Sequence, residues 1–379
     1  MTDRTVSPRP QPIGLIVNPI AGMGGPVALK GTDGAAVLAR ARAMGAEPLA
    51  LTRAILGLTK LRASAPPAQL VSVAGAMGGD AASAAGFEPV LIDHEAAAET
   101  TAEDTRAAAR ELLVHNVGLI LFAGGDGTAR DIVEIVGNRV PLLGIPCGVK
   151  MHSAVFAVSP EAAGQLAAVF VNEPHKLAWR DGEVMDVDEE ALRAGRVSAR
   201  LFGYARVPSE RNLVQGPKLA SLGEDAALEA LAAEIAGQLE RDTIYLFGPG
   251  HSTKLILKHL GFTGTLLGVD AFRNGKVLGR DLTAVQVEDI VNGPRAKIVV
   301  SVIGGQGYIF GRGNQQFTPA AIRRLGRDNI IVIASQAKLL ALGQNRLLVD
   351  TGDPALDREL AGFIRVEIGP SRSTMMRIA

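Results

Sequence analysis

The sequence predicts an α/β protein with two parts: an N-terminal, parallel, Rossmann-like sheet covered by helices, and a second part richer in strands. Three observations support this prediction. Short apolar runs alternate with Ala-rich helical stretches over roughly the first 150 residues, which is the pattern of βαβ units. Glycine turns follow several of these runs, as strand-to-helix junctions require, in a chain that contains 44 glycines. Beyond Trp179 strands become more frequent than helices.

The first part is expected to contain six strands, at 13–17, 47–51, 70–73, 89–92, 117–122 and 140–145. The Ala-rich segments between them predict helices on both faces of a parallel sheet. Thr32 or Asp33 is expected to cap a helix that Gly45 ends, and a long helix is expected over 95–114.

The second part is expected to contain strands at 183–188, 197–207, 243–247, 265–272, 276–278, 296–303, 330–334 and 347–349, with a helix over 225–239. Asn274-Gly275 is a strong hairpin signal, because both residues accept the positive φ of a tight turn. The expected division is a disordered tail at 1–12, a nucleotide-binding α/β domain at 13–152 and a strand-rich domain at 153–362. The segment 363–379 is expected to return to the first domain.

Composition narrows the class of protein. A chain of 379 residues is long for a single core, so two domains are expected. Lys and Arg total 39, as do Asp and Glu, which argues against a partner that is a nucleic acid or a membrane surface. No apolar run approaches the ~18 residues of a membrane span, and the polar N-terminus does not resemble a signal peptide. Cys147 is the only cysteine, so a cytoplasmic location is expected.

The most informative motif is the turn Gly124-Gly125-Asp126-Gly127-Thr128, which follows a buried strand and precedes a helix. This arrangement brings backbone N–H groups and a helix N-terminus close to a phosphate. Asp126 is either a turn residue or a functional carboxylate that accepts a proton, holds Mg²⁺ or binds a ribose. Thr128 and Asp131 match a capping box, which leaves Asp126 available for chemistry.

The loop from Asn18 to Gly25 resembles a second phosphate-binding turn, with Asn18, Gly24 and Gly25 as its candidate residues. It matches neither the dinucleotide fingerprint of Rossmann folds nor a Walker motif, and no Walker motif occurs elsewhere in the sequence. The most common phosphate-binding motifs are therefore excluded. Gly75 to Asp80 repeats the glycine–aspartate pattern and is equally compatible with a plain turn.

Further candidates follow other strands. Lys150 is either a counter-charge for phosphate or a solvated lysine, and Ser252 and Thr253 either cap a helix or also face a phosphate or ribose. The loop 311–315 interleaves Arg, Asn and Gln with glycine and is compatible with bidentate donors or with a plain tight loop. No pattern of histidines indicates zinc, and the metal ligands remain unassigned.

Together these motifs resemble a known superfamily, that of NAD kinase, diacylglycerol kinase and 6-phosphofructokinase. The glycine–aspartate turn at 124–128 and Asn18-Pro19 carry the resemblance. The segments 144–150, 248–254 and 311–315 are similar to the ATP-NAD kinase-like branch that includes acetoin-catabolism protein X.

The resemblance implies a two-domain kinase that uses ATP and Mg²⁺ and phosphorylates NAD, with a homodimer or homotetramer as its assembly. Asp126 inherits the role of ribose contact and activator of the hydroxyl. Glu183, together with Asp186, is implied on the substrate side, although Gly182 stands where the family has Asn. Two alternatives stay open: a kinase for a lipid or another small alcohol, and a nucleotide-binding regulator without turnover.

Overall fold

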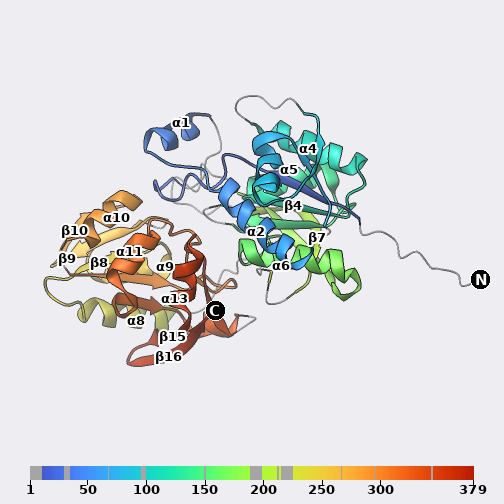
Figure 1. Ribbon diagram of the computed structural model, residues 1–379. Coiled ribbons are helices and arrows are strands. Elements are labelled where there is room, and N and C mark those ends of the chain that lie inside the picture. The colour runs from blue at the N-terminus through green and yellow to red at the C-terminus, as the bar shows by residue number, and fades with distance from the viewer. Residues whose placement is uncertain are drawn as a thin grey trace, which may run out of the picture.

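Two sheets organise the chain. In the computed structural model, five parallel strands form a sheet in the N-terminal part, and nine strands form a mixed sheet in the C-terminal part (Figure 1). The structure describes residues 11–29, 35–66, 68–94, 100–148, 151–187, 199–210, 213–214, 225–265, 267–293, 295–342 and 345–379. Most of the expected tail therefore lies outside the described residues, as do Thr32, Asp33 and Lys150.

The described strands are β1 (Ile13–Val17), β2 (Leu70–Val73), β3 (Val90–Ile92), β4 (Leu119–Gly124), β5 (Leu142–Pro146), β6 (Trp179–Val187), β7 (Ala199–Pro208), β8 (Ile244–Phe247), β9 (Asp270–Arg273), β10 (Lys276–Gly279), β11 (Ala296–Ser301), β12 (Tyr308–Phe310), β13 (Ile330–Ile333), β14 (Arg346–Val349), β15 (Gly362–Gly369) and β16 (Arg372–Ile378). The described α-helices are α1 (Ala35–Ala43), α2 (Ala50–Ser64), α3 (Gly79–Ala84), α4 (Ala102–Val114), α5 (Asp126–Val136), α6 (Pro160–Asn172), α8 (Asp225–Gly237), α9 (His251–His259), α10 (Ala284–Val291), α11 (Pro319–Leu325), α12 (Gln336–Leu340) and α13 (Pro354–Leu360).

The first sheet has the order β3-β2-β1-β4-β5, and all its pairings are parallel. Successive side chains of a strand point to opposite faces of the sheet. Since the central strands consist largely of apolar residues, both of their faces are apolar. Leu119 and Leu121 of β4 join the core beneath α2 and α6, whereas Ile120 and Phe122 join the core beneath α4 and α5. The sheet is thus covered on both faces, as predicted.

One expected strand is not formed. Residues 47–51 were expected to extend a sheet, but residues 47–49 belong to no strand or helix, and α2 begins at Ala50 and buries Ala54, Leu58 and Leu61. The spacing of these residues follows the helical period, and their tertiary packing decides the outcome. The expected long helix over 95–114 is described from Ala102, where Thr101 and Asp104 form a capping box. Residues 95–99 of that expectation lie outside the described residues.

The first part extends further along the chain than the expected boundary at residue 153. Helix α6 packs on α2, and the antiparallel pair β6–β7 packs on α5. Both elements therefore lie against the five-stranded sheet and not with the second sheet.

The second sheet has the order β10-β9-β8-β11-β13-β15-β16-β14-β12. The hairpin predicted at Asn274-Gly275 joins β9 to β10, and both residues have positive φ, 49° and 77°. The expected return of residues 363–379 to the first domain is wrong, because β15 and β16 pair with each other inside the second sheet. The short β12 and the terminal β16 were not expected from the sequence.

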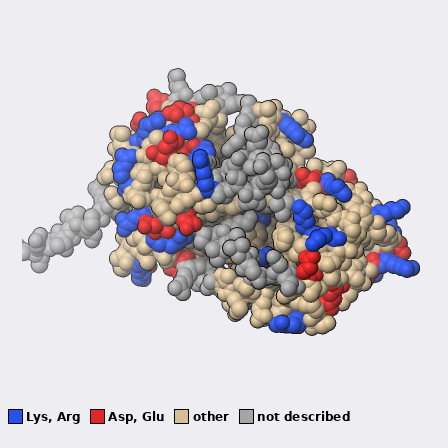
Figure 2. All heavy atoms as spheres, turned by 180° about the vertical axis from the view of Figure 1, so that it is seen from behind, with Lys and Arg blue, Asp and Glu red and all other residues tan. Residues whose placement is uncertain are grey.

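Charge is distributed evenly over the face shown in Figure 2, where Lys and Arg side chains lie among Asp and Glu side chains. Within the described ranges no helix is long and apolar enough to cross a membrane.

The contact between α2 and α6 depends on glycine. A Cβ at Gly164 would lie 2.0 Å from the carbonyl oxygen of Gly57, so no larger residue fits without separating the helices. We expect Gly164→Ala to lower the free energy of unfolding by about 1–3 kcal/mol, the usual cost of overpacking. Gly237→Ala is the matched control, because nothing lies within 4 Å of a Cβ there. Equal stability of the two variants in denaturant unfolding would contradict the prediction.

Candidate active site

The central feature of the site is the glycine turn that joins β4 to α5. Strand β4 ends at Gly124, Gly125 is extended, and α5 begins at Asp126. The capping box expected from Thr128 and Asp131 is wrong, because α5 starts earlier and both residues lie inside it. Asp131 instead forms ion pairs with arginines of α4 and α5.

The Asp126 carboxylate connects the start of α5 to the segment that follows β5. Its Oδ2 accepts a hydrogen bond from the backbone N–H of His152 at 2.8 Å, and its Oδ1 accepts one from Ser153 at 2.9 Å. The imidazole Nδ1 of His152 lies 3.6 Å from the same Oδ2. Asp126 is 8% exposed, so these contacts satisfy a buried charge at a helix N-terminus, where negative charge is favoured.

A side-chain hydrogen bond joins the turn after β1 to the turn after β4. Asn18 donates from Nδ2 to Thr128 Oγ1 at 2.9 Å, while its own Oδ1 accepts from the N–H of Ile20. Gly124 leaves room for this contact, because a Cβ there would lie 2.5 Å from Thr128 Oγ1. Asn18 and Thr128, both predicted site residues, are thus brought together.

The turn after β5 lies against the turn after β4. A Cβ at Gly148 would lie 3.2 Å from the Cα of Gly125, so the two backbones approach closely. Since β1, β4 and β5 are neighbours in a parallel sheet, their turns meet at one edge. Glycine turns with exposed backbone donors at such an edge are typical of phosphate-binding sites. Gly127 belongs to the first turn of α5 in this arrangement.

The first glycine loop contacts the second part of the chain. A Cβ at Gly25 would lie 2.8 Å from Gln315 Oε1, and the carbonyl oxygen of Pro26 accepts a hydrogen bond from Ala284 at the start of α10. Within the loop, Leu29 donates to the carbonyl oxygen of Gly24. The predicted residues Gly24 and Gly25 therefore lie where the two parts meet.

Two glutamines of the second part reach the turn after β5. Gln306 Nε2 donates to the carbonyl oxygen of Met151 at 3.0 Å, and Gln315 Nε2 donates to that of Gly148 at 3.4 Å. The second part is consequently hydrogen-bonded to the segment that carries His152 and Ser153.

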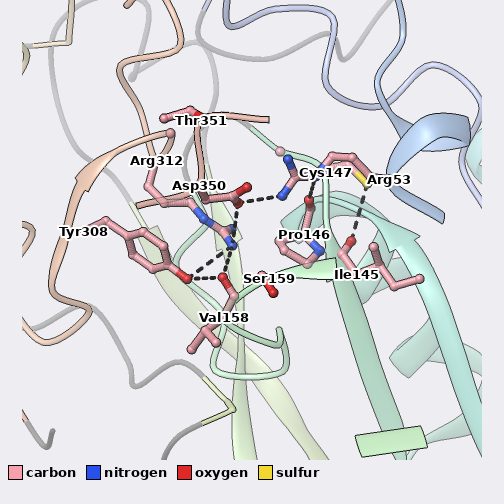
Figure 3. Close-up of polar contacts among 12 residues, drawn as sticks. Arg53, Ile145, Pro146, Cys147, Val158, Ser159, Tyr308, Arg312, Asp350 and Thr351 are labelled. Carbon is pink, nitrogen blue, oxygen red and sulfur yellow. Dashed lines mark hydrogen bonds and ion pairs between the residues drawn. The ribbon is translucent and has the colours of Figure 1, made fainter. Parts of the chain in front are cut away.

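A buried ionic cluster joins the two parts next to this site (Figure 3). Arg53 of α2 lies 2.5 Å from Asp350 Oδ2, and Arg312 of the second part lies 3.2 Å from the same oxygen. The Arg312 guanidinium stacks 4.7 Å from the ring centre of Tyr308, whose hydroxyl donates to the carbonyl oxygen of Val158. One carboxylate thus pairs with an arginine from each part.

Burial and charge shift the pKa values in this cluster. Burial raises the pKa of the Cys147 thiol to about 12, against the opposing effect of the neighbouring Arg53 and Arg312. Burial also raises the pKa of Tyr308 to about 12. Although burial works in the opposite direction, the charge of Asp350 raises the pKa of Arg53 above its usual range. Cys147 and Tyr308 are therefore neutral, and Arg53 is charged, near neutral pH.

Ser252 and Thr253 lie at a different junction, between β8 and α9. Thr253 Oγ1 donates to the carbonyl oxygen of Gly248 at 2.6 Å, and Lys338 Nζ lies 3.2 Å from Ser252 Oγ. Their hydrogen-bond partners in the described part of the chain are thus different from those of Asp126. The N-cap of α9 is Gly250, so neither hydroxyl residue caps the helix.

The predicted substrate-side residues lie on β6, which runs beside the segment that carries Ser153. Ala154 donates to the carbonyl oxygen of Glu183 at 2.7 Å, and Glu183 is partly exposed. The backbone of Asp186 belongs to β6, but its side chain lies outside the description. A Cβ at Gly182 would lie 2.9 Å from the carbonyl oxygen of Ala154. Close backbone packing therefore accounts for glycine at position 182.

Several residues of the site were not predicted. The helical pattern around Arg53 carries no signal of a partner, and neither does the acidic segment that contains Asp350. Arg312 belongs to the glycine loop 311–315, for which the sequence left open bidentate donors or a plain tight loop, and its pairing with Asp350 was not expected. His152 was not among the predicted site residues, and its position after a strand, two residues beyond Lys150, was the one available signal.

The described residues contain no cluster of three or more His, Cys, Asp or Glu side chains that could bind a metal ion. A magnesium ion needs fewer protein ligands than this when substrate phosphates supply the remaining oxygens.

The ionic cluster leads to a prediction about stability. Replacing Asp350 by Asn leaves two buried arginines without their shared counter-charge, so we expect the free energy of unfolding to fall by about 3–5 kcal/mol. Glu359→Gln is the control, because Glu359 pairs with Arg323 on the surface and is 57% exposed. We expect a much smaller change there. Similar denaturant midpoints for both variants would disprove a stabilising role for the cluster.

Cys147 provides a second prediction. Because the thiol is buried and its pKa is raised to about 12, it should react with iodoacetamide far more slowly in the native protein than in guanidinium at about pH 8. Mass spectrometry reads the result directly, since the chain has a single cysteine. Labelling at equal rates in both conditions would contradict the buried position of the thiol.

Comparison with protein families agrees with this geometry. Residues 13–175 match the ATP-NAD kinase N-terminal domain, and residues 241–378 match the ATP-NAD kinase C-terminal domain. Comparison with curated proteins and with solved structures yields no match. The two matched regions span most of the chain and correspond to its two sheets, and the chain therefore belongs to the ATP-NAD kinase family.

Proposed function

We propose that the protein transfers the γ-phosphoryl group of ATP to a ribose hydroxyl of NAD or of a related dinucleotide. Membership of the ATP-NAD kinase family implies an ATP-dependent phosphotransferase with nucleotide substrates. The observation that carries the proposal is the position of Asp126. It is a buried carboxylate at the edge where the glycine turns after β1, β4 and β5 meet.

The glycine turns suit the charge of the substrates. Gly124, Gly125 and Gly127 with Thr128 surround the start of α5, and Gly24 and Gly25 follow β1. In phosphoryl transfer the protein mainly positions the reactants and offsets their charge, so backbone donors and one carboxylate form a sufficient centre. The Asp126 carboxylate would promote loss of the hydroxyl proton, either directly or through a neighbouring base.

The role proposed for Mg²⁺ follows from the ligands that the described residues offer. Asp126 is a single carboxylate whose two oxygens already accept backbone hydrogen bonds. This donor set fits a Mg²⁺ ion whose ligands are mainly phosphate oxygens of ATP and water molecules, with at most one ligand from the protein. When bound, Mg²⁺ would neutralise charge on the transferred phosphoryl group.

A second candidate is a nucleotide-binding regulator without turnover. The specific observation in its favour is Gly182, which replaces the expected Asn and has no room for a side chain. Binding of ATP and NAD without phosphoryl transfer would support this alternative. A lipid or another small alcohol as acceptor and a homodimer or homotetramer remain proposals that rest on the family resemblance. A cytoplasmic location remains a proposal that rests on the single cysteine and the polar N-terminus.

The test combines a substrate panel with one substitution. Purified protein is incubated with ATP, Mg²⁺ and NAD, NADH or simple alcohols, and ³¹P NMR follows the phosphorylated product. We expect Asp126→Asn to lower kcat/KM by about 10²–10⁴-fold, because it removes the charge but preserves the shape of the side chain. Intact activity in this variant would exclude Asp126 from the reaction.

Asp80→Asn is the matched control. Asp80 also follows two glycines at the start of a helix, α3, but it is exposed. We expect this variant to retain wild-type turnover. Thermal unfolding of both variants, with and without nucleotide, separates a loss of chemistry from a loss of folding.

A further inference from the structure

His152 is a buried side chain whose polar atoms have no hydrogen-bond partner. It is 6% exposed, and neither Nδ1 nor Nε2 forms a hydrogen bond with the residues that the structure describes. A buried polar group without a partner costs about 1–3 kcal/mol, so its presence calls for an explanation. The only charged group that the described contacts place beside the ring is Asp126, at 3.6 Å from Nδ1.

Asp126 itself is directed toward the backbone. Both carboxylate oxygens accept N–H groups, from His152 at 2.8 Å and from Ser153 at 2.9 Å. These bonds fix the carboxylate beside the imidazole and orient it toward the 152–153 segment. A carboxylate next to Nδ1 favours the tautomer that carries its proton there, which leaves the lone pair on Nε2.

We propose that His152 is the proton acceptor of the reaction and that Asp126 is the positioning residue that orients it. This inference rests on the proposed function. The acceptor hydroxyl gives its proton to Nε2 while its oxygen bonds to the γ-phosphorus of ATP, and the bond from that phosphorus to the β–γ bridging oxygen breaks. ADP leaves, and the imidazolium returns its proton to water or to the product.

The second part of the chain contacts the segment that carries the ring. Gln306 donates to the carbonyl oxygen of Met151, directly before His152, and Gln306 is itself buried. Both ring nitrogens are also buried. The proposal therefore requires a local rearrangement that exposes Nε2 to the acceptor hydroxyl.

The experiment uses chemical rescue in the full-length protein. Wild-type turnover is measured first, and then that of His152→Gly, with and without added imidazoles of different basicity. We expect His152→Gly to lose about 10²–10⁴-fold in kcat. Imidazole should restore part of the loss, and the restored rate should rise with the basicity of the added base. A structural role for the ring would produce no such dependence.

His94→Gly is the matched control, because His94 also pairs with a carboxylate, Asp104, at 3.0 Å. It should keep wild-type turnover and show no response to imidazole. A double variant tests the positioning role: if Asp126 acts through His152, adding Asp126→Asn to His152→Gly should cause little further loss.

The outcomes separate the two proposals. Absence of phosphoryl transfer by the wild-type protein would overturn both. An active wild-type protein with an active His152→Gly variant, or with a loss that no imidazole restores, would overturn only the role of His152. Should His152→Gly fail to fold, His152→Asn replaces it as a polar side chain without a basic nitrogen. Full activity of that variant would likewise overturn the role.

Discussion

The Asp126 carboxylate satisfies two backbone N–H groups that belong to no strand or helix, those of His152 and Ser153. A buried N–H group without an acceptor is costly, so this one side chain connects α5 to the segment after β5. The charge in turn is tolerated because it lies at a helix N-terminus and accepts these bonds. The turns after β4 and β5 are thereby held together at the edge of the sheet. The residue for which we propose a chemical role thus also has a structural one.

The two parts of the chain are joined by a contact of a different kind. Asp350 lies between Arg53 and Arg312, which come from opposite sides of the junction. Both arginines and the carboxylate are buried, so each depends on the others for a counter-charge. Such a junction favours one arrangement of the two parts. It lies next to the turn after β5, because Arg53 also donates to the carbonyl oxygen of Pro146.

The glycine turn differs in one respect from its prediction. The capping-box pattern predicted that the helix starts at Thr128, with Asp126 outside it. The structure starts the helix at Asp126 and uses Thr128 as the hydrogen-bond partner of Asn18. A Thr followed three residues later by Asp fits a capping box, but here Gly124 provides the space into which the Thr128 side chain turns. Glycine before this helix therefore serves the packing of the Thr128 side chain.

The sequence by itself determined the five parallel strands, the hairpin at Asn274-Gly275 and the glycine turn between β4 and α5, because these depend on local apolar runs and turn residues. It failed at residues 47–51, where a short segment fits either a strand or a helix until its packing is known. Only the tertiary structure decided that Asp350 pairs with Arg53, 297 positions away, and that His152 lies against Asp126. Neither contact has a local signature, because partners far apart in sequence meet only through the way the two sheets and their turns pack.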